Sequence, residues 1–358
     1  MPAPPPGAID CDVHPAVPGT AALLPYLDEQ WADTVRMVLR GIGQLELNSY
    51  PPNAPLSARP DWRPAEGRAG SSLEQLREQL LDRFAPRLAI CNPLFGGQVL
   101  FHEYLAAALC RAVNDWLARE WLDREPRLRG SITVSTVNPE LAAEEIERLA
   151  GDRRFVQVLL LVGNELPLGR RAHWPIFRAA ERHGLPVGVH AGSMFRHPPT
   201  QSGYPSSLVE DYVLQSQVFA SQLASLVAEG VFTKFPALKV VLIESGVTWL
   251  PGFLWRFNKD WRGVRTEVPW VHGSPAEVVR EHVRLTIQPL DGPPDPGALE
   301  RLMEHFRSDE MFLFSTDYPH WQFDGDAALP PGLPATLLHK LLVDNALDTF
   351  PRLKEATP

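Results

Sequence analysis

The sequence predicts an α/β fold, a (β/α)8 TIM barrel with loop insertions at the carboxyl-end face. Short apolar runs alternate with longer amphipathic patterns along the chain, which is typical of a parallel sheet covered by helices. Eight such units can be counted, and that number favours closure into a barrel. The length of 358 residues is also within the usual range for barrels with insertions.

Each predicted strand is a short run of apolar, often β-branched residues. The runs are Ala8–His14, Arg87–Asn92, Leu128–Val137, Phe155–Val162, Leu185–His190, Leu238–Glu244, Val283–Gln288 and Met311–Asp317. The fourth run, Phe-Val-Gln-Val-Leu-Leu-Leu-Val, has the composition of a strand that is buried on both faces.

The segments between these runs carry apolar residues at helical spacing. The predicted helices are Leu73–Arg83, Glu103–Leu122, Pro139–Ala150, Ile176–His183, Leu208–Ala228, Leu250–Arg262, Ala298–Phe306 and Ala335–Asn345. A proline near the first turn supports the start of the third helix at Pro139, and Gly184 is expected to end the helix Ile176–His183.

A doubly wound open sheet is the rival architecture for alternating strands and helices. That fold would place a glycine-rich nucleotide loop after an early strand. The first strand ends instead in Asp-Val-His-Pro, which disfavours the open sheet.

The barrel is expected to form one domain over residues 8–358, after a disordered leader at residues 1–7. The leader lacks the basic and apolar regions of a signal peptide. Residues 41–70 are rich in Pro, Ser and Gly and are predicted to be an insertion. The 36 prolines, about twice the average frequency, indicate stiffened loops on a regular scaffold.

Composition and charge exclude several classes of function. A net charge of −9 and a pI near 5.7 argue against a nucleic-acid or anionic-membrane partner. No apolar run reaches the roughly 18 residues that a membrane span needs. The three cysteines, Cys11, Cys91 and Cys110, lack CxxC spacing, so neither a disulfide framework nor a zinc knuckle is expected. A reducing, cytoplasmic location is therefore the expectation.

Polar residues follow the apolar runs at the strand ends, where a barrel carries its active site. In the first strand, Asp10, Asp12 and His14 are two residues apart and should share a face. Other strands end in His190, Glu244, Gln288 and Asp317. Several carboxylates in one mouth would raise one another's pKa unless a cation were present. A mixed His and carboxylate set suits zinc, manganese or iron.

Each of these residues also has a purely structural interpretation. His190 alone could be an ordinary core histidine, Glu244 could pair with Arg256, and Asp317 could cap the turn that follows it. We favour a metal site because such residues collect at four strand ends of the appropriate fold.

These strand-end motifs resemble those of the amidohydrolase superfamily. The motifs are Asp10-Cys11-Asp12-Val13-His14, Gly188-Val189-His190-Ala191-Gly192 and Ser315-Thr316-Asp317-Tyr318-Pro319-His320. With the ending Leu342–Leu347, they look most similar to the amidohydrolase-related branch, which includes aminocarboxymuconate-semialdehyde decarboxylase and resorcylate-type decarboxylases. The resemblance extends from Ile9 to about Phe350.

The resemblance implies a distorted barrel with one divalent metal ion, zinc as the first expectation and manganese or iron as alternatives. The implied ligands are Asp12, His14, His190 and Asp317, with Asp12 in place of the first His of an HxH motif. The branch usually has a His at the end of strand six that acts on the substrate, whereas this chain has Glu244. No lysine ends strand four, so a carbamylated-lysine two-metal centre is not expected.

Two chemistries use such a scaffold, and hydrolysis is the first prediction. A metal-activated water would attack an amide, ester, thioester or lactone. Asp317 would take the proton from that water and pass it to the leaving group, and Glu244 could assist as a second acid or base or orient the substrate. The alternative is non-oxidative decarboxylation of an aromatic or unsaturated carboxylic acid, which the absent strand-six His disfavours. A second alternative, an inactive barrel that serves as a binding subunit, is disfavoured by the intact set of His14, His190 and Asp317.

Residues just beyond the strand ends are predicted to bind a small-molecule substrate. They are His102, Trp249, Gln288, His320 and Trp321, and Met194 and Phe195 are candidates for the same apolar wall. Ordinary loop packing is the alternative for each. The apolar faces of helices Glu103–Leu122 and Leu208–Ala228 could bury a homodimer interface or simply cover the barrel.

Overall fold

The computed structural model describes residues 7–38, 45, 58–192, 197–321, 329, 333 and 335–355. Within them, eight parallel strands form one sheet in chain order, as predicted. The strands are β1 Ile9–Val13, β2 Leu88–Cys91, β3 Leu128–Thr133, β4 Phe155–Leu161, β5 Val187–His190, β6 Val240–Ile243, β7 Val283–Thr286 and β8 Phe312–Leu313. Most of the predicted leader and of the predicted 41–70 insertion lies outside the described residues.

The sheet closes on itself where the chain beyond β8 runs alongside β1. Three backbone hydrogen bonds join the two segments: Cys11 N to Phe314 O at 2.9 Å, Asp317 N to Asp12 O at 3.1 Å and His14 N to Tyr318 O at 2.8 Å. Closure makes the sheet a barrel of the predicted type. It also brings Asp317 next to Asp12, although 304 positions separate them in the sequence.

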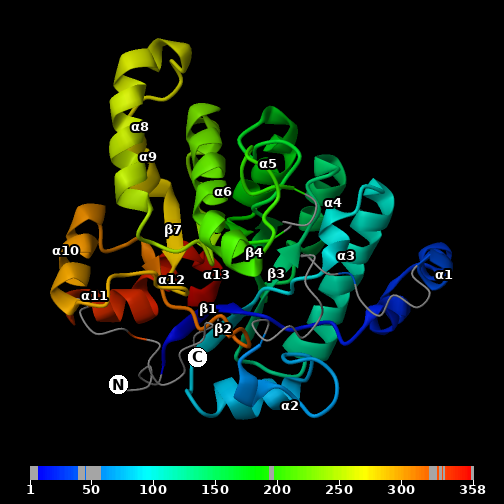
Figure 1. Cartoon of the computed structure of the whole chain (residues 1–358). Helices are drawn as coiled ribbons and strands as arrows, with labels where there is room; N and C mark the ends of the chain where they lie inside the picture. The colour runs from blue at the N-terminus through cyan, green and yellow to red at the C-terminus, as the bar shows by residue number, and fades with distance from the viewer. Residues whose placement is uncertain are drawn as a thin grey trace.

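Helices connect the strands and lie around the outside of the sheet (Figure 1). The α-helices are α1 Glu29–Val38, α2 Leu73–Leu76, α3 Glu103–Leu117, α4 Pro139–Leu149, α5 Trp174–Arg182, α6 Leu208–Ala228, α7 Val231–Lys234, α8 Leu250–Val264, α9 Pro275–His282, α10 Pro296–Phe306, α11 Ala335–His339, α12 Asn345–Thr349 and α13 Pro351–Lys354. Turns of π-helix extend α2, α3 and α11 through Arg77–Leu81, Ala118–Leu122 and Lys340–Asp344. No helix among these residues is long and apolar enough to cross a membrane.

Two helices begin with the same capping motif, but only the longer of them was predicted from the sequence. Helix α6 begins and ends as predicted, and Ser207 forms a capping box with Glu210 at its start. Helix α9 has the same device in Ser274 and Glu277. Its eight residues are too few for apolar periodicity to stand out, and it was not predicted.

Strands β6 and β8 end before the predicted last residues, Glu244 and Asp317, neither of which is in the extended conformation. Both have φ of 59°, in the left-handed region that non-glycine residues seldom adopt. The predicted strands Leu238–Glu244 and Met311–Asp317 are thus longer at both ends than the observed β6 and β8. Residues that bear such backbone strain tend to be held in place for function.

The C-terminal helices close the amino end of the barrel. The apolar cluster inside the barrel joins α12 and α13 to strand residues and includes Ile9, Ile90, Val241, Ile243, Leu313, Ala346, Phe350 and Leu353. A larger cluster packs the outer face of the strands against the surrounding helices. The carboxyl end of the barrel is thus left as the open mouth, where the strand-end polar residues lie.

Arg352 ties α13 to the loops that enter β4 and β5. Its side chain is only 2% exposed. The guanidinium donates to three backbone carbonyls, Phe155 O at 2.7 Å, Ala150 O at 3.0 Å and His183 O at 3.2 Å. A single cation therefore satisfies backbone acceptors from three segments that meet beneath the barrel.

Replacing Arg352 should destabilise the fold strongly. Arg352→Met leaves the carbonyls unpaired, and we expect the free energy of unfolding in urea to fall by about 3 kcal/mol. Arg153→Met is the matched control, because Arg153 is 52% exposed and pairs with Glu355 at the surface; it should cost less than about 1 kcal/mol. Equal losses in the two variants would contradict the anchoring role.

Candidate metal centre

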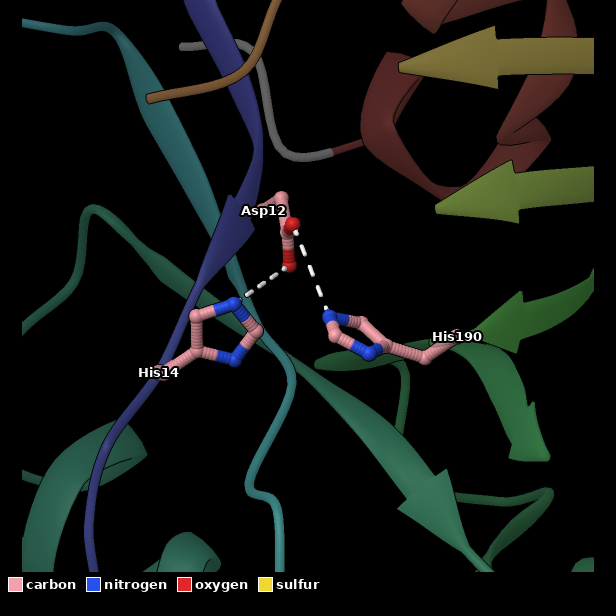
Figure 2. Close-up of side chains that lie close together, drawn as sticks. All are labelled: Asp12, His14 and His190. Atoms are coloured by element: carbon pink, nitrogen blue, oxygen red, sulfur yellow. Dashed lines mark ion pairs between the residues drawn. The ribbon is translucent and has the colours of Figure 1, made fainter. Parts of the chain in front are cut away.

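Asp12, His14 and His190 meet at the barrel mouth from β1, its C-terminal extension and β5 (Figure 2). His14 Nε2 lies 3.1 Å from Asp12 Oδ1, and His190 Nε2 lies 3.7 Å from Asp12 Oδ2. All three side chains are buried. Their potential ligand atoms lie within 4.8 Å of one another, close enough to bind one ion.

Asp12 and His14 face the proposed centre, whereas Asp10 faces the chain beyond β8. The pairing of β1 with β2 shifts between Asp10 and Val13. The Asp10 carboxylate accepts hydrogen bonds from Thr316 N at 3.0 Å and Thr316 Oγ1 at 2.5 Å. Burial raises the pKa of Asp10 to about 7. The prediction that Asp10 faces the same way as Asp12 is therefore wrong. Asp10 instead stabilises the contact between β1 and the chain beyond β8 through its hydrogen bonds with Thr316.

Both histidines turn the same ring nitrogen toward the cluster. His14 Nδ1 lies 2.8 Å from Asn92 O, and His190 Nδ1 lies 2.7 Å from Ala191 O. A carbonyl can only accept, so each Nδ1 carries a proton. In the neutral imidazole each Nε2 then presents a lone pair to the centre, which is how metal-binding histidines are usually oriented.

Two buried atoms of the cluster lack partners. Asp12 Oδ2 and His190 Nε2 make no hydrogen bond in the part of the chain that the structure describes. An unpaired buried polar group costs about 1–3 kcal/mol. Their separation of 3.7 Å is too long for a direct hydrogen bond, but it is close to that of two ligands on one ion with bonds of about 2.0–2.2 Å. The donor set therefore fits a divalent metal ion.

The pKa values of the cluster show the same need for positive charge. Burial alone would raise the pKa of Asp12, but the imidazoles of His14 and His190 outweigh it and lower that pKa. Burial would lower the pKa of His14, but Asp12 and Asp317 outweigh it and raise that pKa. Metal ligands must be deprotonated, so an ion would replace the proton that His14 otherwise holds.

Asp317 extends the cluster toward His320. Asp317 Oδ1 lies 2.9 Å from His14 Nε2 and 2.7 Å from His320 Nδ1. The rings of His14 and His320 stack with centroids 4.4 Å apart. Burial alone would raise the pKa of Asp317, but His320 and His14 outweigh it and lower that pKa. Asp317 thus lies where a further metal ligand or a proton carrier could act.

Glu244 also faces the centre rather than the helix that follows it. Its Oε2 lies 3.7 Å from His190 Nε2, and the side chain is buried. Burial, with repulsion from Asp317 and Asp12, raises the pKa of Glu244 well above its usual value. Arg256, the alternative partner, is 79% exposed and pairs with Asp260 at 2.7 Å on the surface of α8.

The other predicted substrate-binding residues are dispersed. The Trp321 ring meets that of Tyr212 edge-on, with centroids 6.2 Å apart, beside His320. Gln288 is buried after β7.

Two further predicted residues make contacts with the backbone. The Trp249 indole N–H donates to Ser245 O at 3.0 Å. His102 accepts a hydrogen bond from Leu105 N at the start of α3, a structural contact. Met194 and Phe195 lie outside the described residues.

Two residues near the centre were absent from the sequence-based set. Asn92 follows β2 and donates to Asp12 Oδ1 at 2.8 Å. It is polar and ends a predicted strand, so the rule that selected the other residues could have found it. Tyr212 lies on α6. Burial is the main cause that raises its pKa, and the charges of Glu244 and Asp317 raise it further. No local pattern marks Tyr212, because α6 approaches the mouth only in the folded chain.

Curated proteins similar to this chain are decarboxylases. Gamma-resorcylate decarboxylase of Rhodococcus jostii (strain RHA1) is 28% identical over 229 residues, which cover 60% of this chain and 67% of that protein. Two further relatives, from Polaromonas and Rhizobium, have the same name and are matched over 51% and 49% of their lengths. These relatives correct the prediction of a hydrolase, because they support the alternative, decarboxylation.

Solved structures with the same fold cover almost the whole chain. An amidohydrolase from Mycobacterium avium subsp. paratuberculosis K-10 has a TM-score of 0.71 at 21% identity and covers 96% of this chain and 99% of its own. A dihydroxybenzoic acid decarboxylase from Polaromonas sp. JS666, with bound manganese and the inhibitor 2-nitroresorcinol, has a TM-score of 0.65 at 20% identity and covers 97% of each chain. Identities this low support the barrel fold alone.

A family model confirms what the strand-end motifs indicated. The amidohydrolase model matches residues 9–352, which include all eight strands and the proposed metal ligands. The chain therefore belongs to the amidohydrolase family.

Proposed function

We propose that this protein is a metal-dependent, non-oxidative decarboxylase of a hydroxylated aromatic carboxylic acid. The observation that carries the proposal is the buried cluster of Asp12, His14 and His190, in which Asp12 Oδ2 and His190 Nε2 face each other without partners among the described residues. The relatives in the same family support the choice of reaction, since by name they decarboxylate a dihydroxybenzoate.

The ion would be held by Asp12, His14 and His190, with Asp317 as a further ligand. Manganese is our first choice because it is bound in the Polaromonas neighbour, and zinc, the expectation from sequence, is second. Nitrogen and oxygen ligands of this kind suit both ions. When bound, the ion supplies the positive charge that attracts a substrate carboxylate and an adjacent ring hydroxyl.

Decarboxylation requires a proton at the ring carbon that carries the carboxylate. The proton adds to that carbon, the bond to the carboxylate breaks, and carbon dioxide leaves while the electron pair of the bond returns to the ring. No oxidant or reductant is consumed. The protein therefore has to provide one acidic group beside the bound substrate.

Glu244 is our choice for that acid. It is buried beside His190 and stands at the strand-six position where the amidohydrolase-related branch usually has a His that acts on the substrate. In the metal-free site its raised pKa favours the protonated carboxyl. Asp317 is instead favoured as a carboxylate by His320 and His14, which suits a ligand or a positioning role.

Location and assembly stay expectations. The free cysteines, Cys11, Cys91 and Cys110, are all buried, which is compatible with a reducing cytoplasm. A homodimer also remains a prediction, to be tested by sedimentation.

The reaction itself can be tested with γ-resorcylate. Manganese-loaded protein should release carbon dioxide and form resorcinol, and prior treatment with a chelator should abolish this until manganese is restored. Gas release and chromatography measure the two products. A manganese-loaded protein that leaves γ-resorcylate and other hydroxybenzoates intact would contradict the proposed reaction.

The metal ligands can be tested without turnover. His190→Ala should weaken manganese binding by more than about 100-fold, since outer-sphere partners alone contribute roughly 10- to 100-fold. His282→Ala is the matched control, because His282 is also buried and its Nδ1 lies 2.9 Å from a carbonyl, Leu238 O, away from the mouth. Titration calorimetry gives both dissociation constants, and equal values would exclude His190 as a ligand.

The role of Glu244 can be tested by three substitutions. Glu244→Ala should lower kcat by about 10²- to 10⁴-fold, the usual contribution of a general acid, while manganese affinity is largely retained. Glu244→His should keep more activity, because imidazole can also carry the proton. Glu145→Ala is a control at another buried glutamate, which pairs with Arg148 at 2.7 Å. Loss of manganese rather than of kcat in Glu244→Ala would make Glu244 a ligand instead.

A further inference from the structure

Asn92 contacts two of the proposed metal ligands through different atoms. Its side-chain Nδ2 donates to Asp12 Oδ1 at 2.8 Å. Its backbone carbonyl accepts the hydrogen bond from His14 Nδ1, also at 2.8 Å. Asn92 is fully buried and directly follows β2. One residue outside the ligand set therefore controls both ligands that β1 and its extension supply.

The orientation of the Asn92 amide is fixed by residues on the next two strands. Ser131 Oγ donates to Asn92 Oδ1 at 2.6 Å, and Gln157 Nε2 donates to the same oxygen at 2.9 Å. Gln157 Nε2 also donates to Ser131 Oγ at 2.8 Å, so the hydroxyl proton must be directed to Asn92. Because Oδ1 accepts two donors, Nδ2 is the end that faces Asp12.

The two residues that orient the Asn92 amide lie on strands. Ser131 belongs to β3 and Gln157 to β4, and both are fully buried. On β5, Gly188 leaves room for Gln157, because a Cβ atom there would lie 2.8 Å from Gln157 Oε1. Buried hydrogen-bonded networks of this kind fix side-chain positions.

The hydrogen bond from Asn92 makes the two oxygens of Asp12 different. Oδ1 is occupied by Asn92 Nδ2 and lies near His14 Nε2. Oδ2 has no hydrogen-bond partner within the described residues and lies 3.7 Å from His190 Nε2. The amide thus presents one chosen oxygen to the position between Asp12 and His190.

We propose that Asn92 is a positioning residue of the metal centre. Its amide selects Oδ2 of Asp12 as the oxygen that faces the ion, and its carbonyl holds His14 so that Nε2 faces the ion. The inference rests on the metal site of the proposed function but not on the reaction. Partners of metal ligands typically contribute about 10- to 100-fold to metal affinity.

The test is manganese binding. Electron paramagnetic resonance measures the free and the bound ion. Asn92→Ala should raise the dissociation constant by about 10- to 100-fold and change the spectrum of bound manganese, because Asp12 can rotate. Ser131→Ala removes one of the two donors that orient the amide and should change both readouts in the same direction by less. It serves as the second variant if Asn92→Ala does not fold.

Asn114→Ala is the matched control for loss of a buried amide. Asn114 is fully buried on α3, and its Nδ2 donates to Thr133 O at 3.0 Å and Glu145 Oε1 at 2.8 Å. This variant should lose stability and keep the wild-type dissociation constant and spectrum. A purely structural role for Asn92 predicts that Asn92→Ala behaves in the same way.

The outcomes separate this inference from the proposed reaction. Wild-type affinity in a folded Asn92→Ala, or in Ser131→Ala if the former does not fold, would overturn the positioning role. Weakened manganese binding in a protein that releases no carbon dioxide would support the positioning role and count against decarboxylation. A wild-type chain that binds neither manganese nor zinc would overturn the metal centre and the role of Asn92 with it.

Discussion

The centre is built around a shortage of positive charge at the barrel mouth. Asp12, Asp317 and Glu244 are all buried there, and an unpaired buried charge costs several kcal/mol, a large share of the stability of a folded protein. His14 and His190 offset part of this cost and lower the pKa of Asp12. Glu244 is left with a raised pKa. A divalent ion would supply the missing positive charge and so stabilise the buried carboxylates at the barrel mouth.

The barrel provides the precision that this electrostatic balance needs. Where the sheet closes, Asp317 N donates a hydrogen bond to Asp12 O. Glu244 N donates a hydrogen bond to Thr286 Oγ1 at 3.1 Å. These bonds hold the left-handed backbone at Glu244 and Asp317, a conformation that costs about 1–3 kcal/mol at each residue. Neighbouring strands therefore maintain the strain, and the two carboxylates do not depend on flexible loops for their positions.

Local sequence was enough for the strand order and for most residues of the centre, because each apolar run ends in a polar residue at the same edge of a parallel sheet. It was not enough for Asp10, whose direction depends on its contact with Thr316 in the chain beyond β8. The contact of Tyr212 with Trp321 likewise depends on how α6 packs over the mouth. The choice between hydrolysis and decarboxylation could not be read from Asp12, His14 and His190, because a metal site of this kind was expected for either reaction.

In the proposed reaction, Glu244 in place of a strand-six His would link substrate binding to proton delivery. An imidazolium would attract an anionic acid, whereas a glutamate in its charged form would repel it. The protonated carboxyl of Glu244 does not repel a carboxylate held nearby, and only that form can donate a proton to the ring carbon. The requirement for binding and the requirement for catalysis therefore select the same protonation state. Burial and repulsion from Asp317 and Asp12 raise the pKa of Glu244, and its buried position beside His190 places it where the proposed acid would act.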